Sequence, residues 1–376
     1  IGEFRSALPL IDGLLAQGET IHVTCFTPAG RREAVKRLAT PMAEGRASVS
    51  WVPLELAWAY RRFFRRVQPK YGLVMEIEIW PRMIASARAN NVPLLMCNAQ
   101  YPSRSFERDQ EKTKLRGALM TGFSGALVKS ELQRDRFAAA GVTNIAVTGE
   151  LRFDQPLPAP LIAAGQTLRA QLAPDRPVIC FASVVEGEDP LMITAIQTLL
   201  SGDGPRPFIV YVPRAPERFA PVREELTQNG LSVAARSDVL DSDFALISAP
   251  DNVDILLGDS LGEMYGYLAM ADRVVVGGGF NPKGAHNISE ALALGKPVWT
   301  GPYVWTIEYP AVEAAQAGVL RQTEATGAAL ARALGPDAPP PASEKAIAAF
   351  FTQHSGATAR TLAAIPQVLE TARRPV

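Results

Sequence analysis

The stretch Arg273–Gly279 has the sequence RVVVGGG, and His286–Gly295 follows it with HNISEALALG. An apolar run that ends in three glycines predicts a buried strand leading into a tight loop, and the second stretch predicts a helix that ends at Gly295. Gly277, Gly278 and Gly279 lack a Cβ, so a ligand can approach their backbone closely. The helix start offers N–H groups and the positive end of a dipole to an anion. These features together predict a nucleotide site.

Two side chains at this helix start support a nucleotide. Glu290 lies one turn into the predicted helix, where its carboxylate can accept hydrogen bonds from both hydroxyls of a ribose, and Asn287 lies beside it. The alternative needs no ligand, because Asn287 and Glu290 also have the spacing of a capping box. The glycines stand in the second half of the chain, whereas dinucleotide enzymes have them after the first strand. The position therefore favours a sugar-nucleotide transferase.

Composition narrows the classes of protein. At 376 residues the chain is longer than one typical core and predicts two domains. The 38 basic and 38 acidic residues cancel, so no net field favours nucleic acid as a partner. Cys25, Cys97 and Cys180 lie in apolar runs and are expected to be buried thiols. Three histidines without an HExxH or CxxC motif predict no metal site. No apolar run reaches the roughly 18 residues that span a bilayer.

Short apolar strands alternate with helices along the chain, which predicts an α/β fold with parallel sheets. The runs DQPLPAP at Asp154–Pro160 and DAPPP at Asp337–Pro341 predict breaks between domains. We expect two doubly wound Rossmann-like domains facing a central cleft, in residues 1–154 and 160–335, with helices in 336–376 packing back on the first. The expected strands are 20–26, 47–52, 71–77, 92–98, 125–128, 144–148, 177–183, 207–212, 243–247, 272–276 and 297–299.

The beginning of the chain is unusual for this fold. Ile1-Gly2-Glu3 leads directly into an amphipathic helix over Phe4–Ala16, without an initiator Met. A first helix in an α/β fold normally follows a first strand. The numbered chain is therefore expected to be cut, with a first strand and any membrane anchor upstream of it.

Other polar residues follow predicted strands, at the edge where such sheets bind ligands. Glu76 and Glu78 end the strand 71–77, and alternation is expected to direct both carboxylates to one face. Ser260 stands three residues before Glu263, which is again the spacing of a capping box. Lys129 and Arg152 also follow strands and are expected to be solvated surface charges; contact with phosphates of the acceptor substrate is the alternative.

Eight segments resemble, in the same order, the motifs of the Kdo (3-deoxy-D-manno-oct-2-ulosonic acid) transferases of lipopolysaccharide synthesis, two-domain enzymes of the GT-B fold. The similarity spans nearly the whole chain. The segments are Ile1–Glu3 (family S-[IV]-G-E), Glu76–Pro81 (E-x-E-[LIF]-W-P), Asn98–Ser105 (NARLSERS), Thr148–Asp154 (TGNLKFD), Ser183–Glu188 (STHEGE), Val212–Phe219 (VPRHPERF), Gly258–Met264 (GDTMGEL) and Gly284–Glu290 (GGHNPLE).

Four positions depart from the family pattern. Val185 and Ala215 stand where the family has histidines, Gln100 replaces an arginine, and Ala291 replaces a proline. Two of them fall in segments expected to bind the donor. A divergent paralogue with an altered donor pocket therefore stays open.

The resemblance implies an inverting transfer of Kdo from CMP-Kdo to the lipid A precursor, without a metal or other cofactor. It assigns the general base to Glu3; the alternative is an acidic residue that merely suits a helix N-terminus. It implies Arg214, Ser260 and the three glycines for the phosphate, although a salt bridge or a helix cap would also explain Arg214 and Ser260. It implies Asn287 and Glu290 for the ribose. The acceptor residues it implies are Glu76, Glu78, Arg104 and Ser105, although Glu78 could instead only pair with a nearby arginine.

The segment Trp58–Arg66, WAYRRFFRR, is basic and aromatic at helical spacing. It suits an anionic membrane surface, which predicts a location on the cytoplasmic face of the bacterial inner membrane. A helix with its aromatics packed inward is the alternative. Three other functions stay open: a GT-B transferase that uses a UDP-sugar, a non-catalytic nucleotide-binding paralogue, and an NAD(P) enzyme. The last lacks a GxGxxG after any strand of the first domain.

Overall fold

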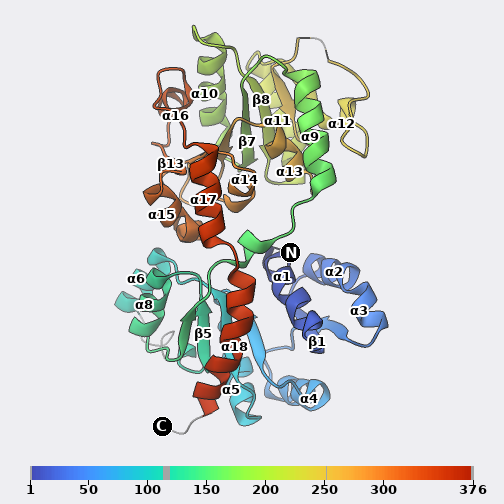
Figure 1. Ribbon diagram of the computed structural model, residues 1–376, viewed down its shortest axis with the longest axis vertical. Helices are drawn as coiled ribbons and strands as arrows, with labels where there is room; N and C mark the ends of the chain where they lie inside the picture. Colours follow the sequence, from blue (N-terminus) through green and yellow to red (C-terminus); the bar gives the residue numbers. More distant parts are fainter. Residues whose placement is uncertain (1, 113–118, 251, 374–376) are drawn as a thin grey trace. The chain divides into compact units, whose positions relative to one another are not determined.

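The computed structural model describes residues 2–112, 119–250 and 252–373, so Ile1 of the first motif lies outside it. The chain divides into two compact units, shown in Figure 1. Unit 1 combines Ile1–Gln155 with His354–Val376, and unit 2 is Pro156–Gln353. Every named strand pair in both units is parallel, as βα repetition predicts.

Unit 1 contains a parallel sheet in the order β3-β4-β5-β6. Its central strand β4 (Leu94–Ala99) is buried at every residue, because helices cover both faces. On one face, Tyr60 of α4 and Phe137 of α8 join one hydrophobic cluster. On the other face, Leu10 of α1 and Ile365 of α18 join a second cluster. The last helix thus belongs to the core of unit 1.

A smaller parallel sheet in unit 1 pairs β1 with β2. The apolar face of α1 packs on it, with Ile11 and Leu15 against Cys25 and Leu38. Helix α1 therefore contributes to two hydrophobic clusters at once. The elements of unit 1 are α1 (Gly2–Ala16), β1 (Ile21–Cys25), α2 (Pro28–Arg37), α3 (Ala39–Ala43), β2 (Ala47–Trp51), α4 (Ala57–Val67), β3 (Gly72–Met75), α5 (Pro81–Ala89), β4, α6 (Ser103–Lys112), β5 (Gly125–Val128), α8 (Glu131–Ala139), β6 (Ile145–Val147), the 3₁₀ turn η1 (Leu151–Asp154) and α18 (Ala357–Arg373).

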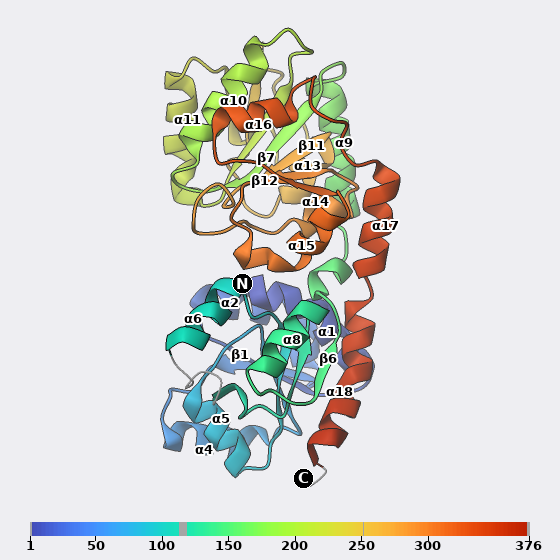
Figure 2. The same cartoon turned by 90° about the vertical axis from the view of Figure 1, so that its left-hand side faces the viewer.

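Unit 2 is built on a seven-stranded sheet in the order β13-β12-β11-β7-β8-β10-β9. Helices lie on both sides of it, with α10 and α16 on one side and α9 and α13 on the other (Figures 1 and 2). Ile193 and Ile196 of α10 and Leu330 of α16 pack on Phe181 and Val275 of the sheet. The central strands are apolar along their length, as expected for strands buried on both faces.

The elements of unit 2 are α9 (Ala159–Leu172), β7 (Val178–Val184), α10 (Asp189–Ser201), β8 (Phe208–Pro213), η2 (Pro216–Arg218), α11 (Phe219–Gln228), β9 (Val233–Ala235), α12 (Arg236–Val239), β10 (Ile255–Leu257), α13 (Met264–Met270), β11 (Arg273–Val276), α14 (Ser289–Ala293), β12 (Val298–Thr300), η3 (Trp305–Ile307), α15 (Glu308–Gln316), β13 (Leu320–Gln322), α16 (Gly327–Leu334) and α17 (Glu344–His354).

One expected strand of unit 2 was wrong. Residues 243–247 form a turn with a single bridge, Leu240 to Leu246, and Phe244 has a positive φ of 66°. Phe244 is 1% exposed and meets Tyr267 at 5.1 Å between ring centroids, so its apolar character serves packing and not pairing. Strands β9, β10 and β13, three residues each, were missed, whereas β6 and β12 of the same length were among the expected strands.

Candidate functional site

Strand β7 occupies the position in unit 2 where the connections change direction. The chain passes from β7 to β8 on one side, and β11 later pairs with β7 on its other side. The loops after β7 and β11 therefore leave the sheet in opposite directions and open a crevice at their carboxyl ends. In doubly wound sheets this crevice is where ligands bind.

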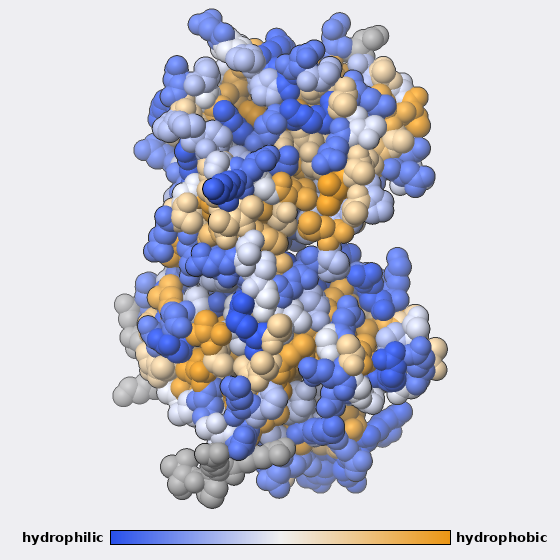
Figure 3. Space-filling view, in the orientation of Figure 1, coloured by the Kyte–Doolittle hydropathy of each residue, from blue (hydrophilic) through white to orange (hydrophobic). Residues whose placement is uncertain are grey.

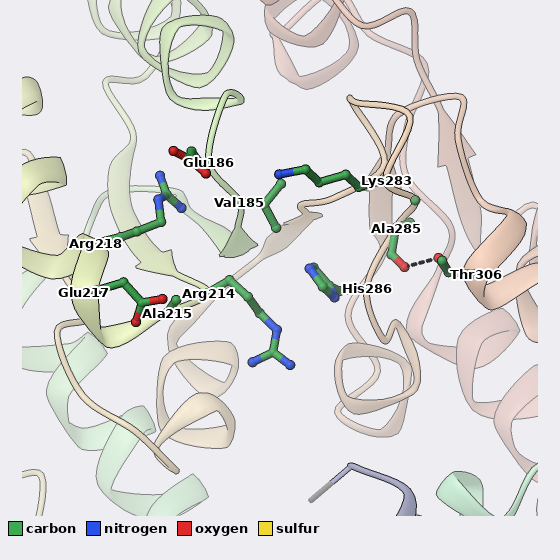
Figure 4. Close-up of a pocket in the computed structure, with 11 residues that line it drawn as sticks. Val185, Glu186, Arg214, Ala215, Glu217, Arg218, Lys283, Ala285, His286 and Thr306 are labelled. Carbon is green, nitrogen blue, oxygen red and sulfur yellow. Dashed lines mark hydrogen bonds between the residues drawn. The ribbon is translucent and has the colours of Figure 1, made fainter. Parts of the chain in front are cut away.

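A pocket of about 360 Å³ lies at this point and is shown in Figure 4. Its volume falls within the range of small-molecule sites. Four segments supply its walls, following β7, β8, β11 and β12. The lining residues are Val185, Glu186, Arg214, Ala215, Glu217, Arg218, Lys283, Gly284, Ala285, His286 and Thr306. Val185 and Ala215, two of the departures from the family pattern, thus lie in one pocket.

The two arginines after β8 have different surroundings. The guanidinium of Arg218 donates to the carbonyl of Val184 and to the Asp189 carboxylate, so it is committed to the protein. Arg214 is exposed, and within the described residues its side chain makes no hydrogen bond or ion pair. Its backbone N–H donates to the Val184 carbonyl at 2.9 Å, which holds the residue at the pocket. Arg214 is therefore the arginine available to an anion.

His286 is a pocket residue that the sequence analysis did not single out. Its backbone N–H donates to the carbonyl of Gly277 at 3.0 Å, which ties it to the glycine loop. Burial, and to a smaller extent the nearby charge of Arg214, lower the pKa of His286 to about 4. The imidazole is thus neutral at pH 7. His286 lies in the segment Gly284–Glu290, which resembles a family motif, and this could have marked it as a candidate beside Asn287 and Glu290.

The amides of the glycine loop were expected to face a phosphate, but two amides of this loop bind a carboxylate of the protein instead. Gly278 and Phe280 donate their N–H groups to the Glu188 carboxylate at 2.8 and 2.9 Å. Glu188 is 1% exposed, and this burial raises its pKa despite these bonds. A Cβ at Gly279 would lie 2.3 Å from Thr300 Oγ1. Other parts of the protein therefore approach the glycine backbone closely. A buried carboxylate and the next loop occupy the space that a ligand would need.

Replacing Gly278 with Ala tests this account. Gly278 has φ +85°, and an added Cβ would lie 2.5 Å from the carbonyl oxygen of Gly284; Gly187 has φ +91° with open space around it. Gly187→Ala should cost only the left-handed backbone, about 1–2 kcal/mol. Gly278→Ala should cost about 1–3 kcal/mol more, for overpacking. Urea denaturation measures both, and equal losses would show that crowding at Gly278 is absent.

The other residues predicted for the donor also follow the carboxyl ends of strands but do not line the pocket. Asn287 Oδ1 accepts from Ser289 N at 3.0 Å and Ser289 Oγ at 2.6 Å, so it fixes the start of α14. Because Asn287 bonds to Ser289, the hydrogen bonds at this helix start differ from those of the expected capping box. The Glu290 carboxylate lies close enough to α13 to help burial raise the pKa of Tyr265. Its contact with a ribose stays a prediction.

Ser260 lies in a separate polar cluster after β10. Its hydroxyl is hydrogen-bonded to the Glu263 carboxylate and lies 2.7 Å from the hydroxyl of Tyr267. Glu263 in turn pairs with Arg236 at 2.7 Å. Glu263 makes no side-chain cap at α13, so the capping-box spacing reflects a side-chain network instead. The phosphate role of Ser260 stays a prediction.

Unit 1 gathers a second group of polar side chains at the carboxyl edge of its sheet. Lys129 Nζ lies 2.7 Å from Glu150 Oε2 and 3.2 Å from Glu76 Oε1. Asn98 donates to both carboxylates, at 2.9 Å to Glu150 and 3.3 Å to Glu76. The side chains of Lys129 and Glu150 are only 3% and 2% exposed. The expectation that Lys129 is solvated was therefore wrong, because two carboxylates neutralise it inside the protein.

Of the predicted acceptor residues, Glu76 belongs to this group, and Glu76 and Glu78 do not share one face. Strand β3 ends at Met75 and Glu76 has φ +59°, so the alternation expected for Glu76 and Glu78 no longer applies. The Glu78 carboxylate is exposed and accepts from Trp80 Nε1 at 2.8 Å. Arg104 and Ser105 lie in the first turn of α6, which follows β4; Arg104 is exposed and Ser105 half-buried.

Glu3 lies exposed in the first turn of α1. One turn later, Ser6 accepts a hydrogen bond from Arg152 Nε at 2.8 Å, and an Arg152 nitrogen lies 4.0 Å from Glu76. Residues three apart share a helix face. The start of α1 is thus held at the same edge of unit 1 as Glu76 and Lys129.

Comparison with known proteins shows which family the sequence is similar to. Residues 1–155 match the profile of the 3-deoxy-D-manno-octulosonic-acid transferase (kdotransferase) family. The chain is 36% identical to the 3-deoxy-D-manno-octulosonic acid transferase of Bordetella pertussis, over 97% of this chain and 85% of that protein. It is 30% identical to the enzyme of the same name from Haemophilus influenzae, over 83% of this chain and 70% of that protein.

Solved structures bear on the fold. A glycosyltransferase from Rickettsia africae aligns with a TM-score of 0.63 at 14% identity, over 97% of this chain and 94% of that one. The UDP-GlcNAc 2-epimerase of Neisseria meningitidis aligns with a TM-score of 0.57 at 12% identity, over 98% and 97%. These likenesses confirm the expected GT-B fold. With the sequence relatives, they lead to one conclusion: the chain belongs to the 3-deoxy-D-manno-octulosonic acid transferase family and is a glycosyltransferase.

Proposed function

We propose that the protein transfers Kdo from CMP-Kdo to the lipid A precursor of lipopolysaccharide, with inversion at the anomeric carbon and Glu3 as the base. The observation that carries the donor part is the pocket at the switch point of unit 2, where the exposed Arg214 side chain has no hydrogen bond or ion pair among the described residues. Family membership supports the sugar.

The proposed transfer moves one proton and one electron pair. The acceptor hydroxyl gives its proton to the Glu3 carboxylate as its oxygen bonds to the anomeric carbon of Kdo. The bond from that carbon to the phosphate oxygen breaks, and CMP leaves with the electron pair. Arg214 offers two parallel N–H groups to the departing phosphate, which suits a planar guanidinium. Because this positive charge comes from the protein, we expect transfer to continue in the presence of EDTA.

Acceptor recognition is proposed for unit 1. The acceptor offers phosphates and sugar hydroxyls, which match the guanidinium of Arg104 and the oxygens of Glu78 and Ser105. Glu76 also belongs to the proposed set, although its carboxylate already receives Lys129 and Asn98. It therefore contributes by fixing the shape of this edge as well as by any contact of its own.

We also propose that a surface of unit 1 meets anionic lipid on the cytoplasmic face of the inner membrane. Four arginines of α4 are exposed: Arg61, Arg62, Arg65 and Arg66. Trp58 is 62% exposed at the start of α4, which supports a contact with lipid, while Tyr60 and Phe64 pack inward. No helix among the described residues is long and apolar enough to cross a membrane. On the face drawn in Figure 3, hydrophobic residues are interspersed among hydrophilic ones.

The decisive experiment incubates the protein with CMP-Kdo and a lipid A precursor and follows the acceptor by mass spectrometry. A mass increase equal to one or more Kdo residues is the expected result. Titration with CMP and with UDP runs beside it. Saturation by UDP at lower concentration would replace CMP-Kdo with a UDP-sugar. Tight CMP binding without any transfer would favour the non-catalytic paralogue.

Replacing Glu290 with Gln tests the ribose contact. If its carboxylate accepts both ribose hydroxyls, the variant should bind CMP more weakly by about 1–3 kcal/mol, the range for a charge-assisted hydrogen bond. Isothermal titration calorimetry measures this, with the exposed Glu344→Gln in unit 2 as the matched control. Unchanged affinity would restrict Glu290 to its contacts with α13.

A further inference from the structure

The pocket of unit 2 holds two positively charged side chains that the protein leaves unmatched. Arg218 is paired with Asp189, whereas neither Arg214 nor Lys283 has a hydrogen bond or ion pair from its side chain among the described residues. The two come from different loops, after β8 and after β11. In Figure 4 the Lys283 amine and the Arg214 guanidinium lie on opposite sides of His286, and the amine lies beside Val185.

The loop that carries Lys283 is well held. Asn281 Oδ1 accepts from Lys283 N at 2.9 Å, and Trp305 Nε1 donates to the Pro282 carbonyl at 3.2 Å. The Thr306 hydroxyl donates to the Ala285 carbonyl at 2.5 Å, drawn as a dashed line in Figure 4. Lys283 therefore starts from a fixed backbone at the pocket, and its exposed side chain is free to meet a ligand there.

A single phosphodiester does not account for two separated cations. The phosphate suits Arg214, because a guanidinium forms two parallel hydrogen bonds to it. Lysine is a compact point charge and suits a second, separate anion. Glu186 and Glu217 also line the pocket. Their carboxylates repel an anionic ligand, so a second anion needs a positive partner of its own.

We propose that Lys283 binds the carboxylate of the donor sugar, while Arg214 binds the phosphate. This assignment rests on the proposed function, since CMP-Kdo carries both a phosphodiester and a carboxylate on its anomeric carbon. Lys283 is then the residue that distinguishes an acidic sugar donor from a neutral one. His286 lines the same pocket and is uncharged at pH 7, so it adds no charge of its own to either proposed contact.

The test compares the nucleotide alone with the whole donor. In Lys283→Gln, the affinity for CMP should change by less than about twofold, because CMP lacks the carboxylate. The KM for CMP-Kdo should rise roughly 10- to 100-fold, the effect of losing one charge-assisted hydrogen bond. Arg214→Gln should weaken CMP and CMP-Kdo together. In Lys283→Arg, the KM for CMP-Kdo should return most of the way to that of the unaltered protein. The exposed Lys345→Gln is the control for losing a surface charge.

Three results would overturn the assignment. An unchanged KM in Lys283→Gln would leave the carboxylate to another group. An equal loss of CMP and CMP-Kdo in that variant would move Lys283 to the phosphate. A loss of thermal stability that explains the whole effect would make Lys283 structural, although its exposure argues against this. The proposed function fails separately, and takes this assignment with it, if the unaltered protein neither binds CMP nor uses CMP-Kdo.

Discussion

Glu3→Gln is expected to lower the turnover of Kdo transfer by roughly 10²- to 10⁴-fold, the usual contribution of general-base assistance. Glutamine keeps the size of the side chain and a hydrogen-bond acceptor, but it cannot take the proton of the acceptor hydroxyl. Glu3 belongs to unit 1 and the proposed nucleotide pocket to unit 2, so CMP affinity should not change. Single-turnover kinetics with CMP-Kdo, together with calorimetry with CMP, measure the two quantities.

Asp12→Asn provides the control for Glu3, because it removes one exposed carboxylate from the same helix α1. Its turnover should equal that of the unaltered protein. Full turnover in Glu3→Gln would show that another group takes the proton, with Glu78 and Glu76 the nearest candidates by sequence motif. Loss of turnover and CMP binding together would point to unfolding or to a role on the donor side.

Lys129→Met is expected to destabilise unit 1 by about 3–5 kcal/mol, because it leaves the buried Glu150 carboxylate without its main counter-charge. Glu150 lies 2.7 Å from Lys129 Nζ, and its side chain is 2% exposed. Methionine fills much of the space of the lysine chain, so the loss reports on charge and not on a cavity. Urea denaturation of the full chain measures the free energy of unfolding.

The double variant Lys129→Met with Glu150→Gln separates the two causes. Without either charge, much of the lost stability should return. If the double variant is as unstable as Lys129→Met, packing and not charge is responsible. The exposed pair of Lys70 and Glu19, with nitrogen and oxygen 3.1 Å apart, supplies the control. Lys70→Met should change stability by less than about 1 kcal/mol.

The same cluster predicts a dependence on pH. Burial on its own raises the pKa of Glu150, but Lys129 and Arg152 outweigh it and bring the pKa down to about 2, from a usual value of 4.5. A depressed pKa contributes stability above the unfolded-state value, and this stability is lost as the pH falls from about 4.5 to about 2. Unfolding measured between pH 7 and pH 2 should show this loss in the unaltered protein and a smaller loss in Lys129→Met.

The elements of unit 2 could largely be predicted from the sequence, because its long buried strands have a strong local signal. Strand β11 and its three glycines were found where expected, and so were β7 and β8. The motifs also led to the family and the GT-B fold, since their order along the chain is independent of contacts. The three-residue strands β9 and β13 were missed, whereas β12 of the same length was among the expected strands.

What the glycines, carboxylates and cations do was decided by tertiary contacts. No local pattern shows that Glu188, ninety residues before Gly278, occupies the amides of the glycine loop. None shows that Lys129 is buried between Glu76 and Glu150, since both carboxylates come from other strands. The pairing of a charge depends on which loops meet at the edge of a sheet. The sequence therefore determined the kind of residues at each strand end, and only the fold decided which charges neutralise one another and which, like Arg214 and Lys283, remain for a ligand.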